Sequence, residues 1–385
     1  MKAEASIAII GGGIIGASIA YNLSKRGAES VVVLEKSKFG AGSTSASLGG
    51  YRHQFSNALS IKLSKESIKI IENFKNLTDY DPLSTRDGYL FIASMEGSLA
   101  QLKRNMELAR SENIPVEFLQ ANEMQERFPY YKFDGILGGT YCALDGHAST
   151  LAVLQGFISK SREYGAELYE NTEVTGIKKS SSPPMTIFTT RGEIRAKKII
   201  IASGAYSGLV GSLAGINIPI KPYPRKILIT HSFSNGIPPM IPLIIDVDST
   251  LGMGREGKGI LMAENGPNVS SFELVFPPDY DERVVSLALR RVPALGNASI
   301  SYANAGLYEM TPDSNPIVSA ISGSSGLYCC AGFAGHGFMH APIIGELMAE
   351  MVSGEKPHLD ITGFDIRRFE EEGNREVTKK EGLII

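Results

Sequence analysis

Three glycines with the spacing G-x-G-x-x-G (Gly11, Gly13 and Gly16) are followed by an acidic residue, Glu35. In this spacing the first glycine allows a tight turn, the second lets the backbone approach a pyrophosphate, and the third lets a helix pack closely on a strand. The N–H groups at a helix N-terminus attract phosphate. A carboxylate about 20 residues beyond the glycines accepts hydrogen bonds from ribose hydroxyls. The pattern therefore predicts a dinucleotide site.

The flanking sequence predicts the elements that such a site requires. Residues 6–10 and 30–34 are short apolar runs typical of buried parallel strands. Residues 14–26 between them are typical of a helix, and Gly27 suits its left-handed C-cap. Strand, glycine turn, helix, strand and acid follow in the order of a dinucleotide-binding βαβ unit, which argues against a plain glycine-rich turn. We expect its contacts from Gly11, Gly13, Ile14, Ile15, Gly16, Glu35 and Lys36.

Three further segments are rich in small residues. Residues 39–50 carry hydroxyls and glycines that suit a phosphate or a flat ring, or else a flexible linker. Residues 202–205 follow a buried strand, and residues 332–338 precede a helix predicted over 341–352. A nicotinamide cofactor would not need a second glycine site so far along the chain. FAD would, with its adenosine end at residues 11–35 and its isoalloxazine end at residues 335–339.

Together these segments resemble the D-amino-acid-oxidase-like FAD oxidoreductases, in the branch of sarcosine oxidase, glycine oxidase and proline dehydrogenase subunits. The landmarks are residues 11–35, 49–52, 202–205, 308–313 and 332–338. The resemblance implies an α/β fold, α+β overall, with a Rossmann-like FAD-binding domain built from discontinuous segments (1–85, 145–212 and 305–385). It also implies a substrate-binding domain with a mainly antiparallel sheet (86–144 and 213–304).

The resemblance also implies residue roles. Arg52, which stands in a mostly uncharged segment, would bind a substrate carboxylate, and Tyr308 would line the substrate pocket. Val174 would lie on the adenine side. The remaining cofactor contacts would come from Gly42, Ser43, Thr44, Gly49, Gly50, Ala202, Gly204, Gly306, Gly335, His336, Gly337, Phe338 and Met339.

The implied activity is oxidation of the C–N bond of a small amino acid or secondary amine, of the proline, sarcosine, glycine or D-amino-acid type. A hydride would pass to flavin N5 and leave an imine, with O2 or another acceptor taking the electrons. The alternative is a non-catalytic FAD-binding or electron-transfer subunit of a hetero-oligomeric amino-acid dehydrogenase. Homo- or hetero-oligomers are both compatible with the sequence.

Two departures from the family pattern refine this expectation. Family members that bind flavin covalently through a cysteine carry that cysteine two residues before the tyrosine that matches Tyr308. This chain has Gly306 there, so we expect FAD to be bound non-covalently. Met339 replaces the lysine of sarcosine oxidases, which argues against sarcosine. Residues 259–263 also lack the lysine expected near flavin N5 in enzymes that use O2, which slightly favours a dehydrogenase over an oxidase.

Composition excludes other classes of function. The net charge of −3 provides no basic footprint for nucleic acid. Three cysteines in 385 residues do not form a disulfide framework, so we expect a reducing, cytoplasmic setting. Two pairs of possible metal ligands (Asp246 with Asp248, and His336 with His340) lack further ligands nearby in sequence, so we expect no metal.

Overall fold

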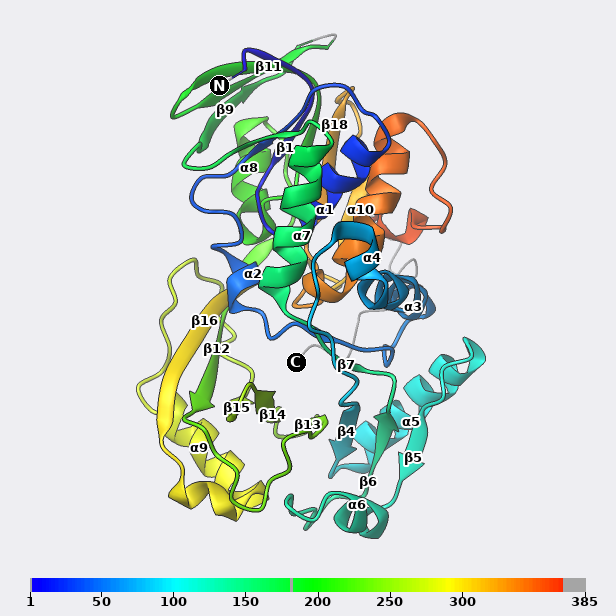
Figure 1. Ribbon diagram of the computed structural model, residues 1–385, viewed down its shortest axis with the longest axis vertical. Helices are drawn as coiled ribbons and strands as arrows, with labels where there is room; N and C mark the ends of the chain where they lie inside the picture. Colours follow the sequence, from blue (N-terminus) through cyan, green and yellow to red (C-terminus); the bar gives the residue numbers. More distant parts are fainter. Residues whose placement is uncertain (1, 181–182, 370–385) are drawn as a thin grey trace.

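The computed structural model describes residues 2–180 and 183–369, and its strands form two eight-stranded sheets and one small two-stranded sheet. In Figure 1 the two large sheets occupy the upper and lower parts of the molecule, and the chain passes between them several times. The expected mixed α/β fold is confirmed. The end of the expected 305–385 segment, from residue 370 onward, lies outside the described residues.

The first sheet has the order β17-β18-β11-β1-β2-β8, and the hairpin β9–β10 extends from β11. Within it β18, β11, β1, β2 and β8 run parallel, while β17 is antiparallel to β18. The strands are β1 (Glu4–Ile10), β2 (Val31–Leu34), β8 (Glu167–Tyr169), β9 (Val174–Lys178), β10 (Met185–Thr189), β11 (Gly192–Ile201), β17 (Ile317–Ala320) and β18 (Leu327–Ala331). Both strands of the predicted βαβ unit are present.

Three long helices, α1 (Ile14–Lys25), α7 (Thr150–Glu163) and α10 (Gly337–Ser353), pack beside this sheet (Figure 1). A Cβ atom on Gly345 of α10 would lie 2.1 Å from Ser18 Oγ of α1, so the two helices cross in close contact. Gly27 ends α1 with a φ of +78°, as expected. The prediction for α10 was wrong at its start, because the helix begins at Gly337 rather than 341 and takes Pro342 into its interior.

The second sheet has the order β16-β12-β15-β14-β13-β4-β6-β5 and is antiparallel except for the pair β13–β4. Its strands are β4 (Tyr89–Ala93), β5 (Glu117–Leu119), β6 (Gly138–Cys142), β12 (Lys221–Thr230), β13 (Leu243–Asp246), β14 (Gly252–Glu256), β15 (Gly259–Ala263) and β16 (Ile300–Met310). These strands come from the two segments expected for the substrate side, and β16 runs through the expected boundary at residue 305.

One face of the second sheet is covered by α9 (Tyr280–Arg291) and by α6 (Ala121–Arg127), and the apolar residues between them form a separate core. Leu228, Ile260 and Ile244 belong to that core. Alternate residues of the same strands point to the opposite face of the sheet. That opposite face is the one on which the residues of the candidate site lie.

The remaining elements connect the two sheets or lie beside them. They are α2 (Ser43–Ala46), β3 (Gly50–Tyr51), α3 (Ala58–Glu72), α4 (Phe74–Thr78), α5 (Glu96–Ser111), β7 (Gly146–His147) and α8 (Ser207–Leu213), with short 3₁₀ turns at Gly204–Tyr206, Pro293–Asn297, Thr362–Phe364 and Ile366–Phe369. The small sheet is formed by β3 and β7. No helix in the described part of the chain is both long enough and apolar enough to cross a membrane.

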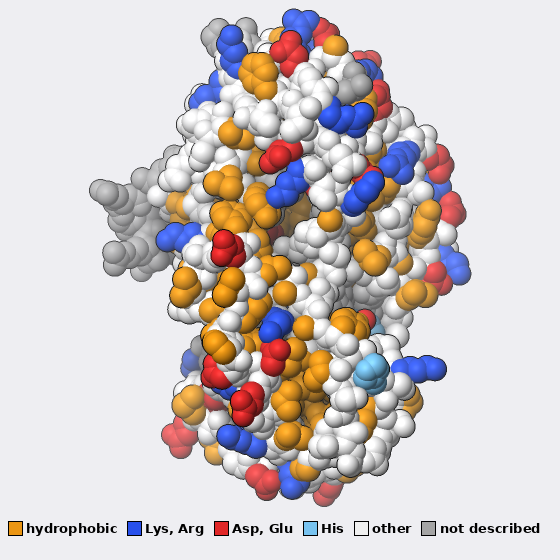
Figure 2. All heavy atoms as spheres, turned by 90° about the vertical axis from the view of Figure 1, so that its left-hand side faces the viewer, with side chains coloured by type: hydrophobic (Ala, Val, Ile, Leu, Met, Phe, Trp, Pro, Cys, Tyr) orange, Lys and Arg blue, Asp and Glu red, His pale blue; other side chains and the backbone are white. Residues whose placement is uncertain are grey.

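Large apolar side chains are exposed on one side of the molecule. Figure 2 looks at the side that carries α2, α8 and β16, and apolar side chains are spread over much of it. The exposed residues on these elements and on the loop before α9 include Leu209, Leu213, Val269, Phe272, Leu274, Val275, Ile300 and Tyr302.

Candidate cofactor and substrate site

The glycine-rich turns meet at one edge of the first sheet. Because β18, β11 and β1 are parallel neighbours, the segments that follow them emerge at the same edge. Gly11 has a φ of +115°, and a Cβ there would lie 2.3 Å from the carbonyl oxygen of Ala202. A Cβ on Gly16 would lie 2.0 Å from the carbonyl oxygen of Gly11. The turns at 11–16 and 202–204 are therefore in direct contact.

The N-terminus of α1 opens onto this edge. Gly13 is its N-cap and supplies no side-chain acceptor. The N–H of Ile14 instead donates to Thr44 Oγ1 at 3.0 Å, which fixes the short helix α2 over the turn. A Cβ on Gly42, at the start of α2, would meet nothing within 4 Å. Other N–H groups of the first helical turn have no intrahelical acceptor, so they and the open space suit phosphate oxygens.

Glu35 stands directly after β2, beside the same turn. One oxygen of its carboxylate accepts from Gly12 N at 2.7 Å and the other from Ser37 N at 2.8 Å. A carboxylate has about four acceptor positions, so capacity for a ribose hydroxyl remains. Thr172 N donates to the Glu35 carbonyl, which brings the start of β9, and with it Val174, to this end of the site.

Lys36 lies against an aromatic ring: its Nζ is 3.1 Å from the ring centroid of Tyr206. The side chains of Ile14 and Ile15 are buried in the core around α1, so only their backbone groups face the edge. Phe338 and Met339 are likewise buried in that core. Their predicted role is therefore restricted to the backbone at the start of α10.

The second end of the site is the start of α10. Its N-cap, His336, accepts no capping hydrogen bond through its side chain. Gly335 has a φ of +89°, and a Cβ there would lie 2.6 Å from the ring of Tyr308. The Tyr308 ring on β16 therefore lies directly over Gly335, and it joins the second sheet to the N-terminus of α10.

Glu309, the neighbour of Tyr308, is a residue that sequence reasoning missed. Its Oε1 accepts from Phe333 N at 3.3 Å. Its Oε2 is buried and has no hydrogen-bond partner among the residues described, and a Cβ on Gly204 would lie 3.4 Å from it. Burial raises the pKa of this carboxyl to about 7. The only sequence signal that could have identified Glu309 is its place, as an acid, between glycine-rich segments.

Arg52 follows β3 and is almost fully buried, with 2% of its surface exposed. Its guanidinium lies 4.7 Å from the ring centroid of Phe55 and 5.1 Å from that of Phe91. Its Nη2 is 2.9 Å from Nε2 of His336. Because arginine has only donors, this nitrogen of His336 accepts, and the imidazole is neutral. Arg52 is thus fixed at the N-terminus of α10.

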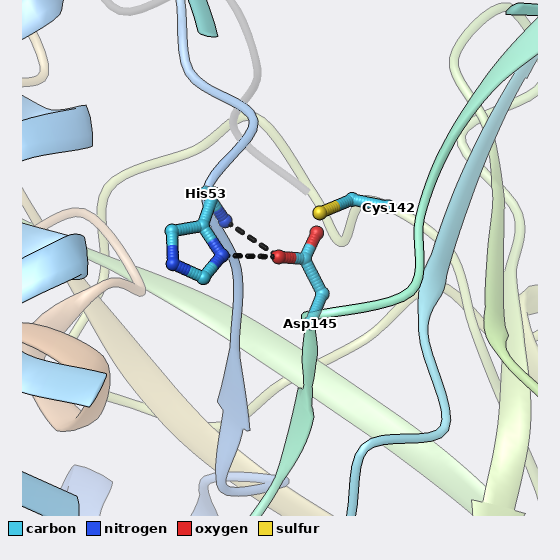
Figure 3. Close-up of side chains that lie close together, drawn as sticks. All are labelled: His53, Cys142 and Asp145. Atoms are coloured by element: carbon cyan, nitrogen blue, oxygen red, sulfur yellow. Dashed lines mark hydrogen bonds and ion pairs between the residues drawn. The ribbon is translucent and has the colours of Figure 1, made fainter. Parts of the chain in front are cut away.

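The backbone beside Arg52 is held by a buried acid (Figure 3). Asp145 Oδ1 accepts from both the backbone N, at 2.9 Å, and the imidazole Nδ1, at 2.7 Å, of His53. Cys142 lies on the other side of the carboxylate, and burial together with Asp145 raises the pKa of its thiol. The three side chains lie close enough to hold a metal ion. Because Asp145 Oδ1 already accepts both hydrogen bonds from His53, we interpret the group as an anchor for residues 52 and 53.

Tyr308 is influenced by two cations. Burial raises the pKa of its hydroxyl, and the charges of Arg225 and Arg52 act in the opposite direction. In the pairing of β12 with β16, Tyr223 is opposite Tyr308 and Arg225 is opposite Gly306, so all four residues share one face of the sheet. Sequence reasoning had not singled out Arg225, because nothing local to β12 marks it.

Several of the predicted glycines are required by protein packing. A Cβ on Gly306 would lie 2.5 Å from the Cβ of Ala46 in α2. A Cβ on Gly49, whose φ is +70°, would lie 1.9 Å from the carbonyl oxygen of Ala148, and one on Gly50 would lie 1.9 Å from Tyr89 Oη. These contacts seat the loop 42–50 between the two sheets. Ser43 Oγ also donates to the carbonyl oxygen of Leu307.

These residues fit an extended dinucleotide with a second binding end. The uncapped α1 N-terminus, Thr44 and Glu35 suit a pyrophosphate and a ribose. The buried, unpaired Oε2 of Glu309 and the uncapped α10 N-terminus provide polar groups at the other end. Both ends lie on the carboxyl edge of one sheet, which is where open α/β folds bind nucleotides.

Comparison with known proteins agrees with this geometry. The chain is 27% identical to human dimethylglycine dehydrogenase, over 96% of this chain and 45% of that protein. It is 26% identical to the sarcosine oxidase subunit beta of an Arthrobacter species, over 96% of this chain and 92% of that one. The crystal structure of L-proline dehydrogenase from P. horikoshii matches with 31% identity and a TM-score of 0.88, over 96% of this chain and 99% of that one.

The chain thus spans about half the length of the dimethylglycine dehydrogenases that it matches. Residues 6–351 match the family model described as FAD dependent oxidoreductase, which covers both sheets and both ends of the site. The chain therefore belongs to the family of FAD-dependent oxidoreductases, and FAD is its cofactor.

Proposed function

We propose that the chain oxidises the C–N bond of a small amino acid or secondary amine that carries a carboxylate. The observation that supports this most strongly is the position of Arg52 and Tyr308 at the N-terminus of α10, where the second sheet meets the carboxyl edge of the first. FAD, when bound, supplies a hydride acceptor. The residues of the chain have to bind the substrate, orient it and stabilise the charge that develops.

The proposed roles follow from the contacts. Arg52 binds the substrate carboxylate, because a guanidinium pairs with a carboxylate through two parallel hydrogen bonds. The Phe55 and Phe91 rings and the acceptor His336 restrict the guanidinium to one orientation. Tyr308 lines the pocket beside it. The N-terminus of α10 would supply partial positive charge next to the flavin ring, which takes up the electrons.

We propose the same cofactor contacts as the sequence predicted, grouped by the two ends of the site. Gly11, Gly13, Gly16, Glu35, Thr44 and Val174 serve the adenosine and pyrophosphate, and residues 335–339 serve the ring end. The first-sheet segments then form the FAD-binding domain and the second-sheet segments form the substrate-binding domain. The link to FAD is non-covalent, since Gly306 replaces the cysteine and packs against Ala46.

The enzyme acts as a dehydrogenase in this proposal, within the cytoplasm. The L-proline dehydrogenase match and the absence of lysine in β15 support this choice over an oxidase. The name of the Arthrobacter relative, a subunit, and the exposed apolar side chains on α8 and β16 (Figure 2) support an oligomer. No separate observation favours a purely structural FAD-binding subunit.

An anaerobic substrate screen tests the proposal. The purified yellow protein is mixed with single amino acids and N-substituted glycines, and flavin absorbance is followed near ~450 nm, the usual flavin band. We expect bleaching by at least one amine that has a carboxylate, and return of the colour faster with an artificial acceptor than with O2. A flavin that no such amine bleaches would leave the chain an FAD-binding subunit.

A further inference from the structure

Arg225 carries a positive charge that no acidic side chain of the described residues neutralises. Its Nη1 donates only to the carbonyl oxygen of Pro224, at 2.8 Å. Its Nε is buried and has no hydrogen-bond partner. Burial lowers the pKa of the guanidinium, which means that its surroundings do not favour the charge. Arg225 is partly buried, and a charge that is even partly removed from water is costly when it lacks an ionic partner.

Three other arginines close to the second sheet have protein partners. Arg283 pairs with Glu264, and Arg291 pairs with Asp246 at 3.0 Å. Arg255 donates to the carbonyl oxygens of Phe233, Ile237, Pro238 and Lys258. Arg225 differs from Arg283 and Arg291 because it has no carboxylate partner among the described residues, and from Arg255 because its buried Nε has no acceptor.

Arg225 also faces the site and not the sheet's own core. Its neighbours along β12 alternate, and Leu228 belongs to the core beneath α9. Arg225 lies on the opposite face, with its guanidinium 5.2 Å from the ring centroid of Tyr308. Arg52 influences the same Tyr308 hydroxyl. Two guanidinium groups thus act on one tyrosine at the place proposed for the substrate.

We propose that Arg225 binds a second anionic group of the substrate, so that the substrate is a dicarboxylic amine rather than a simple monocarboxylic one. This inference rests on the proposed function, in which Arg52 takes the first carboxylate. A second carboxylate would reach the unpaired Nε and Nη groups and form charge-assisted hydrogen bonds there. Tyr308 is close to Arg225 and within the electrostatic influence of Arg52, so both anchors belong to one site.

The test compares two amines that differ by one carboxylate, N-methylglycine and N-(carboxymethyl)glycine, with the holoenzyme. Binding of the non-oxidisable acids acetate, malonate, succinate and glutarate is measured in parallel by the change in the flavin spectrum. We expect at least one dicarboxylate to bind about tenfold or more tightly than acetate, the effect of one charged hydrogen bond. We also expect the dicarboxylic amine to have the higher kcat/KM.

Three variants assign the effect to Arg225. Arg225→Met should weaken the binding of that dicarboxylate about tenfold or more and change the affinity for acetate by no more than about threefold. The affinity of Arg225→Lys for the dicarboxylate should lie between those of the wild type and Arg225→Met. Lys221→Met removes the same charge from the exposed start of β12 and should change neither affinity. Flavin content and melting temperature are measured for each variant, because a purely structural role would change these and weaken both acids equally.

The inference is overturned if dicarboxylates bind no more tightly than acetate, or if Arg225→Met weakens both acids alike. It is also overturned if that variant loses FAD, because Arg225 would then serve the cofactor. Failure of the proposed function looks different: no carboxylate-bearing amine would bleach the flavin at all. If N-methylglycine or another monocarboxylic amine bleaches the flavin as well as any dicarboxylic amine does, the proposed function survives and this inference does not.

Discussion

At the scale of single residues, Arg52 is the side chain whose surroundings are most specific. Two aromatic rings pack on its guanidinium and His336 accepts from one nitrogen, so few orientations remain available. Sequence reasoning had placed it in a segment without a nearby acid. In the structure Asp145, a buried acid, accepts two hydrogen bonds from His53, the residue next to Arg52.

Arg52→Met should lower kcat/KM by about 10²-fold or more, because a charged hydrogen bond contributes about 1.5–3 kcal/mol and misplacing the reacting carbon costs more. Arg52→Lys keeps the charge but loses the planar arrangement of donors, so its kcat/KM should lie between those of the wild type and Arg52→Met. Steady-state kinetics on the amine that bleaches the flavin provide the measurement. Near-normal kcat/KM, or a loss that follows only from lost FAD, would show that Arg52 is not the anchor.

Glu309 should make the stability of the FAD-free protein depend on pH. Burial raises its pKa from 4.5 to about 7, so between these values the folded state binds more protons than the unfolded state. Stability therefore falls as pH rises through this window, by on the order of 3 kcal/mol, and levels off above it.

Glu309→Gln has no such proton to lose. Urea unfolding of both proteins between pH 5 and pH 8 should show that the free energy of unfolding of the variant rises relative to that of the wild type as the pH rises to about 7. A difference that stays constant across this range would mean that Glu309 is ionised throughout, and that its Oε2 finds a partner in solution.

At the scale of elements, the short strand β3 and its pairing with β7 hold Arg52, the proposed substrate anchor, between the two sheets. Asp145 lies just before β7 and grips His53, two residues after the end of β3. The same aspartate carbonyl accepts from Gly88 N at the start of β4. One residue thus connects three chain segments, and the position of Arg52 depends on it.

Asp145→Asn should loosen this connection. We expect a loss of about 1.5–3 kcal/mol of stability, the range for a charged hydrogen bond, and a fall in kcat/KM of about tenfold or more because the anchor is displaced. The binding of FAD should remain normal. The control is Cys142→Ala, which leaves the His53–Asp145 contacts intact and should retain kcat/KM within about threefold.

Should Asp145→Asn and Cys142→Ala behave alike in kinetics, the anchoring role of the carboxylate would be refuted. Thermal unfolding and flavin content of both variants separate this result from general destabilisation. A wild-type kcat/KM combined with lower stability would assign Asp145 to the fold alone.

At the scale of the whole molecule, the first sheet, which carries the proposed nucleotide site, meets the mainly antiparallel second sheet at the proposed flavin end. Contacts between the two parts include the Tyr308 ring over Gly335, Gly306 against Ala46, and Asn304 donating to the carbonyl of Ser45. In the proposed function, cofactor and substrate lie where these contacts join the two sheets.

The non-covalent link can be tested on the whole protein. Acid precipitation should release the flavin into the supernatant, because residue 306 is a glycine and because Ala46 leaves no room for a side chain there. Absorbance of supernatant and pellet provides the measurement. Colour retained in the pellet would show a covalent bond through another residue, such as a histidine.

The sequence by itself determined the nucleotide-binding unit. Glycine spacing, apolar runs and caps act over a few residues, so both strands and the helix of the βαβ unit follow from local patterns. The start of α10 was missed because Gly337, expected in the glycine turn, is already helical and because Pro342 is tolerated inside the helix.

Only the tertiary structure decided which distant residues meet. The pairing of β12 with β16, the parallel neighbours β13 and β4, and the grip of Asp145 on His53 join segments that are far apart in sequence. The unmatched charge of Arg225 and the unpaired oxygen of Glu309 are equally invisible in the sequence, because burial and the lack of a partner are properties of the packed chain. Local patterns identify the cofactor, whereas long-range packing places the groups proposed to select the substrate.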